Sequence, residues 1–277
     1  VSMLEGEHGV IKKEFAKLVD WIHAEPLPDI INIPNSLLIA LAEPLRRAVG
    51  RPVCCALQGE ELFIDGLQAP YRDRALDLIR RQVVDVDRFI AVSEYCARYM
   101  REFLQIPEQQ IATVPLGIKM DGYGPPAPDP QTFTVGYFAR VAPEKGLHLL
   151  AQAYVLFRKR IGHASARLRV AGYHAPGPSP YLDDVKRTLD RGGVAGDFED
   201  LGELDRQGKL DYLRQLDVLS VPATYDEPKG LFLIEAMASG VPVVQPRRGA
   251  FIEVVEKTGG GLLVTPDSPE ALAERMA

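Results

Sequence analysis

The sequence predicts an α/β protein with parallel sheets, divided into two domains. Short apolar runs rich in β-branched residues alternate with helical patterns along the chain, which is typical of βαβ units. The chain has 277 residues, of which 46% are apolar and 25% charged, so it is long enough to bury two cores. A segment dense in proline and glycine, between about Gly117 and Pro130, interrupts the alternation. We therefore expect domains at residues 1–122 and 123–277.

The first domain is expected to begin with a surface helix at residues 11–25, whose apolar residues follow one face. Ser93 comes directly before a helical pattern and is predicted to be its N-cap. Strands are expected at residues 29–33, 52–57, 88–92 and 111–114, and further helices at 36–49, 70–84 and 94–104.

The second domain begins with a strand at residues 133–139, followed by a helix at 147–159 and a strand at 167–171. Residues 217–245 then predict a strand, a loop, a helix at 231–239 and another strand, which together form one βαβ unit. Open parallel sheets bind their ligands in the loops that leave the carboxyl ends of strands. The loop at residues 223–230 is therefore the first candidate for a site.

The helix expected at 231–239 is apolar on nearly every side, and Glu235 is its single charged residue. An unpartnered buried carboxylate costs roughly 1–3 kcal/mol or more, so Glu235 requires a partner. Glu227 lies in the loop before this helix, and the amides around Lys229 to Phe232 are free to bind an anion. A ligand with hydroxyl groups at both ends and a phosphate between them, such as a nucleotide-sugar, matches this arrangement. Alternatively, Glu235 pairs with a basic side chain and Glu227 is a solvated loop residue.

A second candidate loop follows the strand at 133–139. It carries Arg140 and Lys145 on a turn that Pro143 and Gly146 shape. Arginine offers a planar fork, lysine offers a point charge, and a helix begins directly afterwards, so the loop suits a diphosphate. The alternative is that both cations are simply solvated.

Two of these segments resemble elements of one enzyme family. EPKGLFLIEAMASGVPVV, from 227 to 244, resembles the E-x7-E region of glycosyltransferase family 4, whose retaining enzymes have the GT-B fold. RVAPEKG, from 140 to 146, resembles the family's GR-x-x-x-x-KG element, with Ala139 in the position of the first glycine. PLGI, at 115–118, resembles the hinge that leaves the first domain.

The resemblance implies two Rossmann-like domains whose parallel sheets face a central cleft, with the N-terminal domain incomplete in this chain. It also implies transfer of a sugar from a nucleoside-diphosphate sugar, with UDP or GDP as the carrier, to an acceptor hydroxyl. Configuration at the anomeric carbon would be retained, and neither a metal nor another cofactor would be needed. Relative to the family, the chain is expected to lack the first strand with its glycine-rich loop and the last helices.

Roles for individual residues follow from the same resemblance. Arg140 and Lys145 would stabilise the charge of the leaving diphosphate, Glu227 would hold the sugar hydroxyls, and these three form the expected catalytic group. Glu235 would bind the ribose. Additional donor contacts are expected from Gly230, Leu231, Phe232, Gly202, Glu203, Leu204, Gly249 and Glu253.

The loop after the second strand departs from the family pattern. Gln58 stands where members of the family often carry a histidine, so no role of that imidazole is carried over. Glu60 and Glu61 follow it and are interpreted as solvated loop acids rather than as catalysts.

Composition and charge limit the kinds of partner that this protein can bind. A net charge of −6 and a pI near 5.5, with no dense basic stripe, argue against nucleic-acid binding. The three cysteines lack metal-ligand spacing, which favours buried reduced thiols in a cytoplasmic protein. No apolar run is as long as a membrane span, and the N-terminus has no signal-peptide pattern. Lys12, Lys13 and Lys17 allow a weak peripheral membrane contact, although a solvated helix face is the favoured interpretation.

The expected partners are thus a nucleotide-sugar donor and a glycan, lipid or small-molecule acceptor. Two alternatives stay open. One is an inactive nucleotide-binding module with the GT-B fold, and the other is a nucleotide-sugar epimerase of the same fold. The inactive module would bind donor without transferring or hydrolysing it, whereas the epimerase would interconvert the sugar with no acceptor present.

Overall fold

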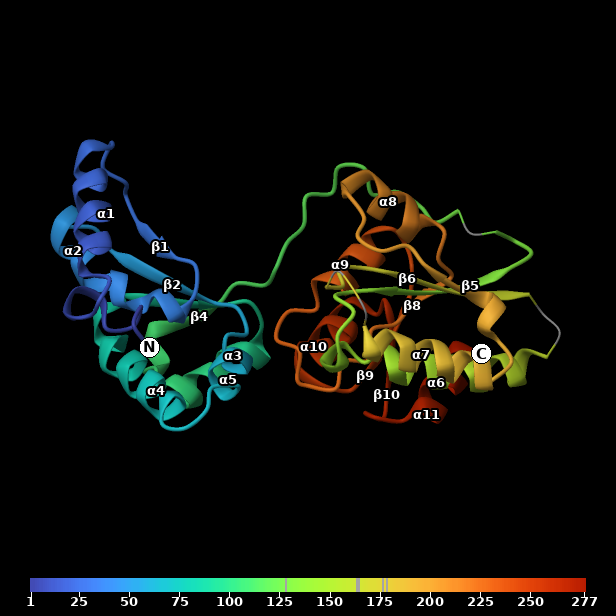
Figure 1. Cartoon of the computed structure of the whole chain (residues 1–277). Coiled ribbons are helices and arrows are strands. Elements are labelled where there is room, and N and C mark those ends of the chain that lie inside the picture. Colours follow the sequence, from blue (N-terminus) through green and yellow to red (C-terminus); the bar gives the residue numbers. More distant parts are fainter. Residues whose placement is uncertain (128, 163–164, 176, 178) are drawn as a thin grey trace. The chain divides into compact units, whose positions relative to one another are not determined.

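A computed structural model describes residues 1–127, 129–162, 165–175, 177 and 179–277. The chain divides into two compact units, Val1–Leu116 and Gly117–Ala277 (Figure 1). Each unit has its own parallel sheet and its own hydrophobic core. The α/β class with parallel sheets, expected from the alternation of apolar runs and helical patterns, is therefore confirmed.

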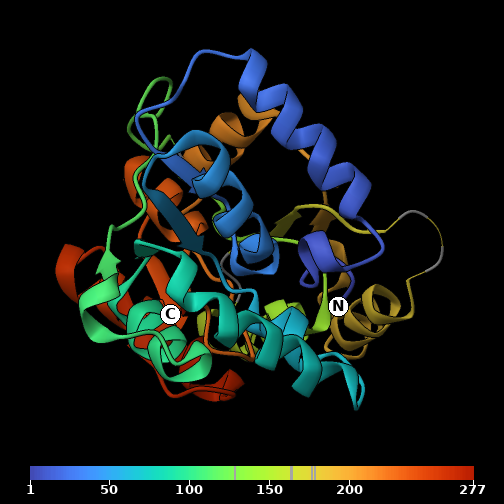
Figure 2. The same cartoon turned by 90° about the vertical axis from the view of Figure 1, so that its left-hand side faces the viewer.

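Unit 1 contains a four-stranded parallel sheet in the order β1-β2-β3-β4. The helix α1 runs along the surface of this unit, where Phe15 is its one fully buried residue (Figure 2). The elements of unit 1 are η1 Gly6–His8, α1 Lys12–Ala24, β1 Ile31–Ile33, η2 Ser36–Leu41, α2 Ala42–Val49, β2 Val53–Leu57, α3 Glu61–Asp65, α4 Tyr71–Gln82, η3 Val83–Asp85, β3 Arg88–Ala91, α5 Glu94–Leu104, η4 Glu108–Gln110 and β4 Ile111–Thr113.

Side-chain caps mark where two helical segments of unit 1 begin. The Ser93 hydroxyl accepts a hydrogen bond of 3.0 Å from the Cys96 amide, so the predicted N-cap of α5 is confirmed. The helix expected at 36–49 is instead a 3-10 segment followed by α2. Its first turn is capped by Asn35, and α2 ends at Gly50, which has a φ of 66°.

Unit 2 contains a six-stranded parallel sheet in the order β10-β9-β8-β5-β6-β7. Its core is formed by the sheet and the helices that pack on it. The elements of unit 2 are β5 Phe133–Phe138, η5 Pro143–Lys145, α6 Leu147–Ile161, β6 Ala166–Ala171, α7 Pro180–Arg191, η6 Ala195–Asp197, β7 Phe198–Asp200, α8 Arg206–Arg214, β8 Val218–Leu219, α9 Leu231–Ala238, β9 Val243–Pro246, α10 Gly249–Thr258, β10 Gly261–Val264 and α11 Pro269–Met276.

The strand order of unit 2 reverses between β5 and β8. The chain moves outward from β5 to β6 and β7, and then returns to the other side of β5 to add β8, β9 and β10. In an open parallel sheet, ligands bind outside the carboxyl ends of the strands at such a switch point. The loops that follow β5 and β8 flank this point, and they are the two loops singled out from the sequence.

Two helices of unit 2, α7 and α8, were not expected. Both begin at side-chain caps, because Ser179 accepts a hydrogen bond from the Leu182 amide and Asp205 accepts one from the Gly208 amide. In addition, Gly249 and Glu253 lie in the first turns of α10.

Candidate functional site

The loops after β5 and β8 are held against each other at the switch point. The Thr224 amide donates to the carbonyl oxygen of Glu144 at 2.9 Å. Gly146 has a φ of 75°, and a Cβ at this position would lie 1.9 Å from the carbonyl oxygen of Pro222. Only glycine permits this approach. The two loops therefore form one continuous surface at the carboxyl edge of the sheet.

A buried ion pair joins these loops. Lys145 Nζ pairs with Glu227 Oε2, and the two side chains are 15% and 6% exposed. The Tyr225 hydroxyl donates to the same carboxylate oxygen and accepts from Lys145. Lys145 Nζ also lies 4.8 Å from the centre of the Tyr225 ring and 5.9 Å from that of Phe232. Glu227 is thus fully enclosed, and its interpretation as a solvated loop residue is wrong.

This pairing decides the charge of Glu227. Burial raises the pKa of the Glu227 carboxyl, but Lys145 and the hydrogen bonds from Tyr225 and the Lys229 amide outweigh burial, so the pKa lies below its ordinary 4.5. The carboxylate is therefore ionised at neutral pH. Lys145 and Glu227 form a fixed dipole at the switch point.

The amino end of α9 adjoins this pair. Gly230, at its N-cap, has a φ of 65° and supplies no side-chain cap. The Lys229 amide donates to Glu227 Oε1 at 3.3 Å, so the expectation that this amide is free is wrong. Within the described residues, the amides of Leu231 and Phe232 have no acceptor. They are the remaining unpaired donors of this helix end, where an anion is stabilised.

Arg140 takes a more exposed position in the same loop as Lys145. Its guanidinium pairs with Glu144, and the Arg140 side chain is 56% exposed. Its carbonyl oxygen accepts a hydrogen bond of 3.0 Å from the Tyr137 hydroxyl, which holds the backbone at the end of β5. The structure thus places one cation inside the enclosed group and leaves the other accessible at its margin.

Gly249 is brought directly against the loop that carries Glu227. Its amide donates to Asp226 Oδ1 at 3.2 Å, and the Ala250 amide donates to the carbonyl oxygen of Glu227 at 2.8 Å. A Cβ on Gly249 would lie 2.4 Å from that carbonyl oxygen, so this position requires glycine. Glu253 lies one turn later in α10, where its carboxylate is 3.6 Å from Lys257.

The stretch Gly202 to Leu204 lies at the carboxyl end of β7. The carbonyl oxygen of Gly202 accepts a hydrogen bond of 2.8 Å from the Gly172 amide, which follows β6. Gly172 in turn lies against Ala139, because a Cβ there would be 1.9 Å from the carbonyl oxygen of Ala139. The loops after β5, β6 and β7 are therefore connected along one edge of the sheet.

Glu235 is 7% exposed, and the partner that its burial requires is present. Lys209 Nζ, from α8, lies 2.5 Å from Glu235 Oε1, and the Tyr123 hydroxyl lies 3.1 Å from the same oxygen. The alternative that Glu235 pairs with a basic side chain is thus confirmed. Lys209 and Tyr123 were missed because they are 26 and 112 positions away from Glu235, and no local pattern links them.

In unit 1, Glu60 and Glu61 are 7% and 6% exposed, so their interpretation as solvated loop acids is wrong. The Glu60 carboxylate accepts hydrogen bonds from the Ser36 amide at 2.8 Å and the Gln58 amide at 2.6 Å. The Gln58 side chain donates to the carbonyl oxygen of Pro34 at 2.8 Å. Gln58 and Glu60 thus fasten the loop after β2 to the loop after β1.

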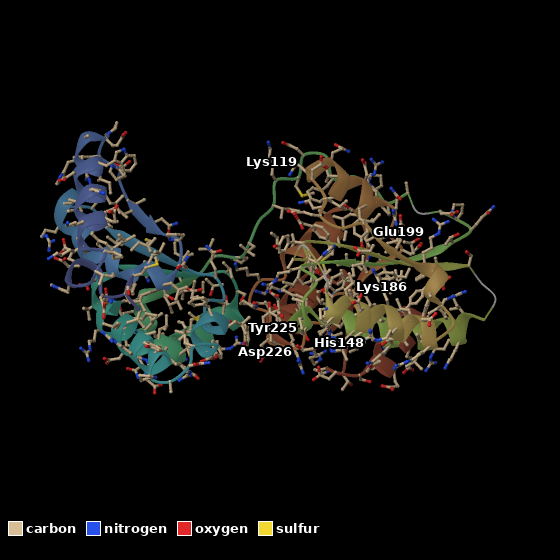
Figure 3. All side chains as sticks on the ribbon, viewed as in Figure 1. Lys119, His148, Lys186, Glu199, Tyr225 and Asp226 are labelled. Atoms are coloured by element: carbon tan, nitrogen blue, oxygen red, sulfur yellow. The ribbon has the colours of Figure 1, made fainter. Side chains whose placement is uncertain are left out.

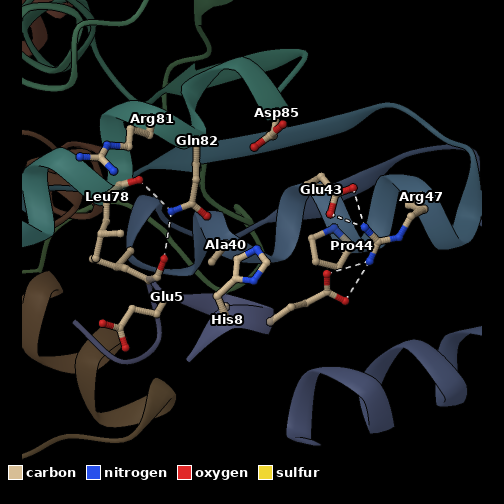
Figure 4. A pocket seen from close by; sticks show the side chains of 13 residues that line it. Glu5, His8, Ala40, Glu43, Pro44, Arg47, Leu78, Arg81, Gln82 and Asp85 are labelled. Carbon is tan, nitrogen blue, oxygen red and sulfur yellow. Dashed lines mark hydrogen bonds and ion pairs between the residues drawn. The ribbon is translucent and has the colours of Figure 1, made fainter. Parts of the chain in front are cut away.

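A hollow of about 580 Å³ lies in unit 1, between η1, α2 and α4 (Figure 4). Its lining carries more carboxylates than arginines, and Arg47 forms ion pairs of 2.7 Å with both Glu7 and Glu43. The hollow is lined by helices and by η1 rather than by loops that follow strands. It therefore lacks both the position and the positive charge of a site for a diphosphate donor.

Three further findings concern metals, membranes and thiols. The described residues contain no group of three or more histidines, cysteines, aspartates or glutamates arranged to hold a metal ion. They also contain no helix long and apolar enough to cross a membrane. Cys54, Cys55 and Cys96 are buried free thiols, as predicted.

Comparison with solved structures identifies the fold of this protein. The structure of Anabaena HepE in complex with UDP superposes with a TM-score of 0.81 and 22% identity, covering 98% of this chain and 73% of that one. Sucrose-phosphate synthase from Thermosynechococcus elongatus superposes with a TM-score of 0.77 and 21% identity, covering 96% and 69%. The fold is that of the GT-B glycosyltransferases.

The family follows from sequence comparison. The model described as "Glycosyl transferases group 1" matches residues 132–277, and "Glycosyltransferase Family 4" matches residues 5–121. The chain belongs to the glycosyl transferases group 1 family.

Two curated relatives illustrate the likeness. The phosphatidyl-myo-inositol mannosyltransferase of Mycobacterium tuberculosis is 30% identical over 193 residues, covering 68% of this chain and 48% of the relative. The D-inositol 3-phosphate glycosyltransferase of Nocardiopsis dassonvillei is 28% identical over 222 residues, covering 74% and 49%. The chain thus spans about half the length of the curated relatives it matches.

Proposed function

We propose that this protein transfers a sugar from a nucleoside-diphosphate sugar to an acceptor hydroxyl, with retention at the anomeric carbon. Family membership supports the reaction class. The observation that carries the proposal is the Lys145–Glu227 pair beside the uncapped amino end of α9, at the switch point of the sheet. A diphosphate needs positive charge and open amides, and a sugar needs a carboxylate acceptor. This edge of the sheet offers all three.

The leaving diphosphate gains negative charge as its bond to the sugar breaks. Lys145 and the amides of Leu231 and Phe232 would stabilise that charge where it develops, and Arg140 would add a planar donor from the margin. Because Lys145 is paired with Glu227 in this structure, donor binding would exchange that contact for the phosphate. Glu227 would then accept hydrogen bonds from the sugar.

The remaining roles extend along the same edge. Glu235 would accept from the ribose, Gly202 to Leu204 would approach the base, and Gly249 with Glu253 would approach the donor sugar. UDP is the favoured carrier, because the Anabaena HepE structure that shares this fold is a complex with UDP. The acceptor would be a hydroxyl of a glycan, a lipid or a small molecule, and the reaction would take place in the cytoplasm, where free thiols stay reduced.

A second function is an inactive nucleotide-binding module. It is favoured by one observation, namely that the Lys145 cation is already neutralised by Glu227 in this structure. Such a module would bind the donor but neither transfer nor hydrolyse its sugar.

Calorimetric titration with UDP-, GDP- and ADP-sugars tests the proposal. We expect one of them to bind the wild-type chain, and Lys145→Met to abolish that binding. Lys186→Met is the matched control, since Lys186 is an exposed lysine of α7 in the same unit (Figure 3). Binding of none of these donors would contradict the proposal. Binding without release of sugar or product, with a range of hydroxyl acceptors, would favour the inactive module.

A further inference from the structure

Glu235 is held by two side chains that come from different parts of unit 2. Lys209 Nζ, from α8, is 2.5 Å from Glu235 Oε1, and the Tyr123 hydroxyl, from the segment before β5, is 3.1 Å from the same atom. Lys209 Nζ also lies 6.0 Å from the centre of the Tyr123 ring. The Lys209 and Glu235 side chains are 18% and 10% exposed. The three residues form one compact polar group.

The segment that carries Tyr123 is anchored to α8. Arg206 Nη2 donates to the carbonyl oxygen of Asp121 at 2.6 Å. Gly122 has a φ of 86°, and a Cβ there would lie 2.7 Å from Leu210 Cδ1. Arg206 and Leu210, which lie on either side of Lys209 in α8, therefore hold the segment that places Tyr123 against Glu235.

Protonation of this group is defined at neutral pH. Burial lowers the pKa of Lys209, but its hydrogen bond and attraction to Glu235 outweigh burial and raise the pKa above its ordinary 10.5. Burial, together with the negative charge of Glu235, raises the pKa of Tyr123 above 10.0. Lys209 is thus a cation and Tyr123 a neutral hydroxyl, so both act as donors to the carboxylate.

The contacts on Glu235 are unevenly divided between its two oxygens. Each carboxylate oxygen can accept about two hydrogen bonds. Oε1 receives both donors, whereas Oε2 receives none from the described residues. We propose that Lys209 and Tyr123 are positioning residues that saturate Oε1 of Glu235 and leave Oε2 to accept the vicinal hydroxyls of a ribose. This inference rests on the proposed function, and it adds two positioning residues to the ribose role proposed there for Glu235.

The physical basis is the rotational freedom of a carboxylate. A glutamate side chain that is not held can rotate and present either oxygen, and ordering it on ligand binding costs free energy. Two donors on Oε1 remove that freedom before the ligand arrives. Hydrogen bonds to a charged acceptor contribute most to the discrimination between a ribonucleotide and an analogue without the ribose hydroxyls. This preorganisation therefore strengthens binding of the ribose hydroxyls and leaves binding of the diphosphate unchanged.

The test compares UDP with 2′,3′-dideoxy-UDP, by calorimetry on the full chain. If the wild type binds GDP instead of UDP, the matching guanosine pair replaces these ligands. We expect the wild type to bind the ribonucleotide at least about 10-fold more tightly than the dideoxy analogue. In Lys209→Met, this ratio falls to about 2-fold, while the dissociation constant of the dideoxy analogue changes less than about 2-fold. Lys209→Arg retains most of the ratio, and Lys186→Met leaves it unchanged.

If Lys209 had a merely structural role, Lys209→Met would weaken the binding of both ligands equally and leave the ratio of their affinities unchanged. That result overturns the inference. Tyr123→Phe removes one hydroxyl and gives a second variant in case Lys209→Met does not fold. An intermediate ratio in Tyr123→Phe supports the inference, and an unchanged ratio overturns it. Failure of the wild type to bind any nucleotide contradicts the proposed function itself. A wild type that binds both analogues equally leaves the proposed function standing but overturns the role of Glu235 and its two partners.

Discussion

Lys145, at the carboxyl end of β5, forms a buried ion pair with Glu227, which follows β8 and lies 82 positions later in the chain. The strand order places these two loops side by side, since β5 and β8 are neighbours in the sheet. The Tyr225 hydroxyl contacts both partners and completes the group. The pair therefore links the stability of unit 2 to the chemistry proposed for its edge.

Lys145→Met should destabilise unit 2 and abolish donor binding. Removing one partner of a buried ion pair leaves an uncompensated charge, which costs about 3 kcal/mol. The double variant Lys145→Met with Glu227→Gln removes both charges and should recover most of that loss, but it should not recover binding. Hydrogen exchange of unit 2 and calorimetry with the donor measure the two effects. Recovery of binding in the double variant would contradict the assigned role of Lys145.

The stabilisation that Glu227 contributes should be lost only toward acidic pH. Burial raises the pKa of the Glu227 carboxyl, but the attraction of Lys145 outweighs burial, so the pKa in the folded protein lies below 4.5. The stabilisation from Glu227 is therefore complete above about pH 4.5, and it is lost as the pH falls through the pKa of the folded protein. We expect the difference in unfolding free energy between the wild type and Glu227→Gln to be constant above this pH and to shrink below it. Denaturant unfolding at a series of pH values measures this difference. A difference that already shrinks as the pH falls from about 7 to about 6 would show that the carboxylate is not ionised as described.

Gly146→Ala should disrupt the junction of the loops after β5 and β8. The new Cβ would lie 1.9 Å from the carbonyl oxygen of Pro222, in a residue with a φ of 75°. We expect a loss of about 3 kcal/mol or more, of which the left-handed backbone accounts for about 1–2 kcal/mol. Gly259→Ala is the matched control, because Gly259 has a φ of 65° and no neighbour within 4 Å. Equal losses in the two variants would show that the contact with Pro222 is unimportant.

Glu60→Ala should loosen the loops after β1 and β2. It leaves the buried Ser36 amide without its acceptor, at a cost of roughly 1–3 kcal/mol, and the cost is smaller for the partly buried Gln58 amide. Hydrogen exchange in residues 34–38 and 57–61 should become faster. Glu108→Ala is the control, since the Glu108 side chain is 84% exposed and such surface charges contribute little. Unchanged exchange in Glu60→Ala would mean that other contacts hold the two loops.

The three cysteines should react slowly with a thiol reagent in the native protein. Cys54, Cys55 and Cys96 are 7%, 0% and 1% exposed. Burial raises the pKa of the Cys54 and Cys55 thiols, so that little thiolate is present at neutral pH. We expect native labelling to be at least about 100-fold slower than labelling in denaturant, because it requires opening of the structure. Fast labelling of one thiol would identify a locally open segment.

Much of the fold could be predicted from local patterns. The strand at Phe133–Phe138 and the helix that begins at Leu231 follow from apolar periodicity, and the cap at Ser93 follows from the chemistry of its side chain. These features depend on residues close together in the chain. The same is true of the motif segments that carry Lys145 and Glu227, which is why both residues could be selected as site candidates.

The sequence by itself thus determined the α/β class, the parallel sheets and the segments that lie at the edge of the second sheet. Only the tertiary structure decided which side chains meet there: Lys145 with Glu227, Lys209 and Tyr123 with Glu235, and, in the first unit, Glu60 with the Ser36 amide. Periodicity records which face of an element is buried, but it does not record which strands become neighbours. Contacts between residues far apart in the chain depend on strand order and loop packing, so the same acidic residue can read as solvated in the sequence and be enclosed in the fold.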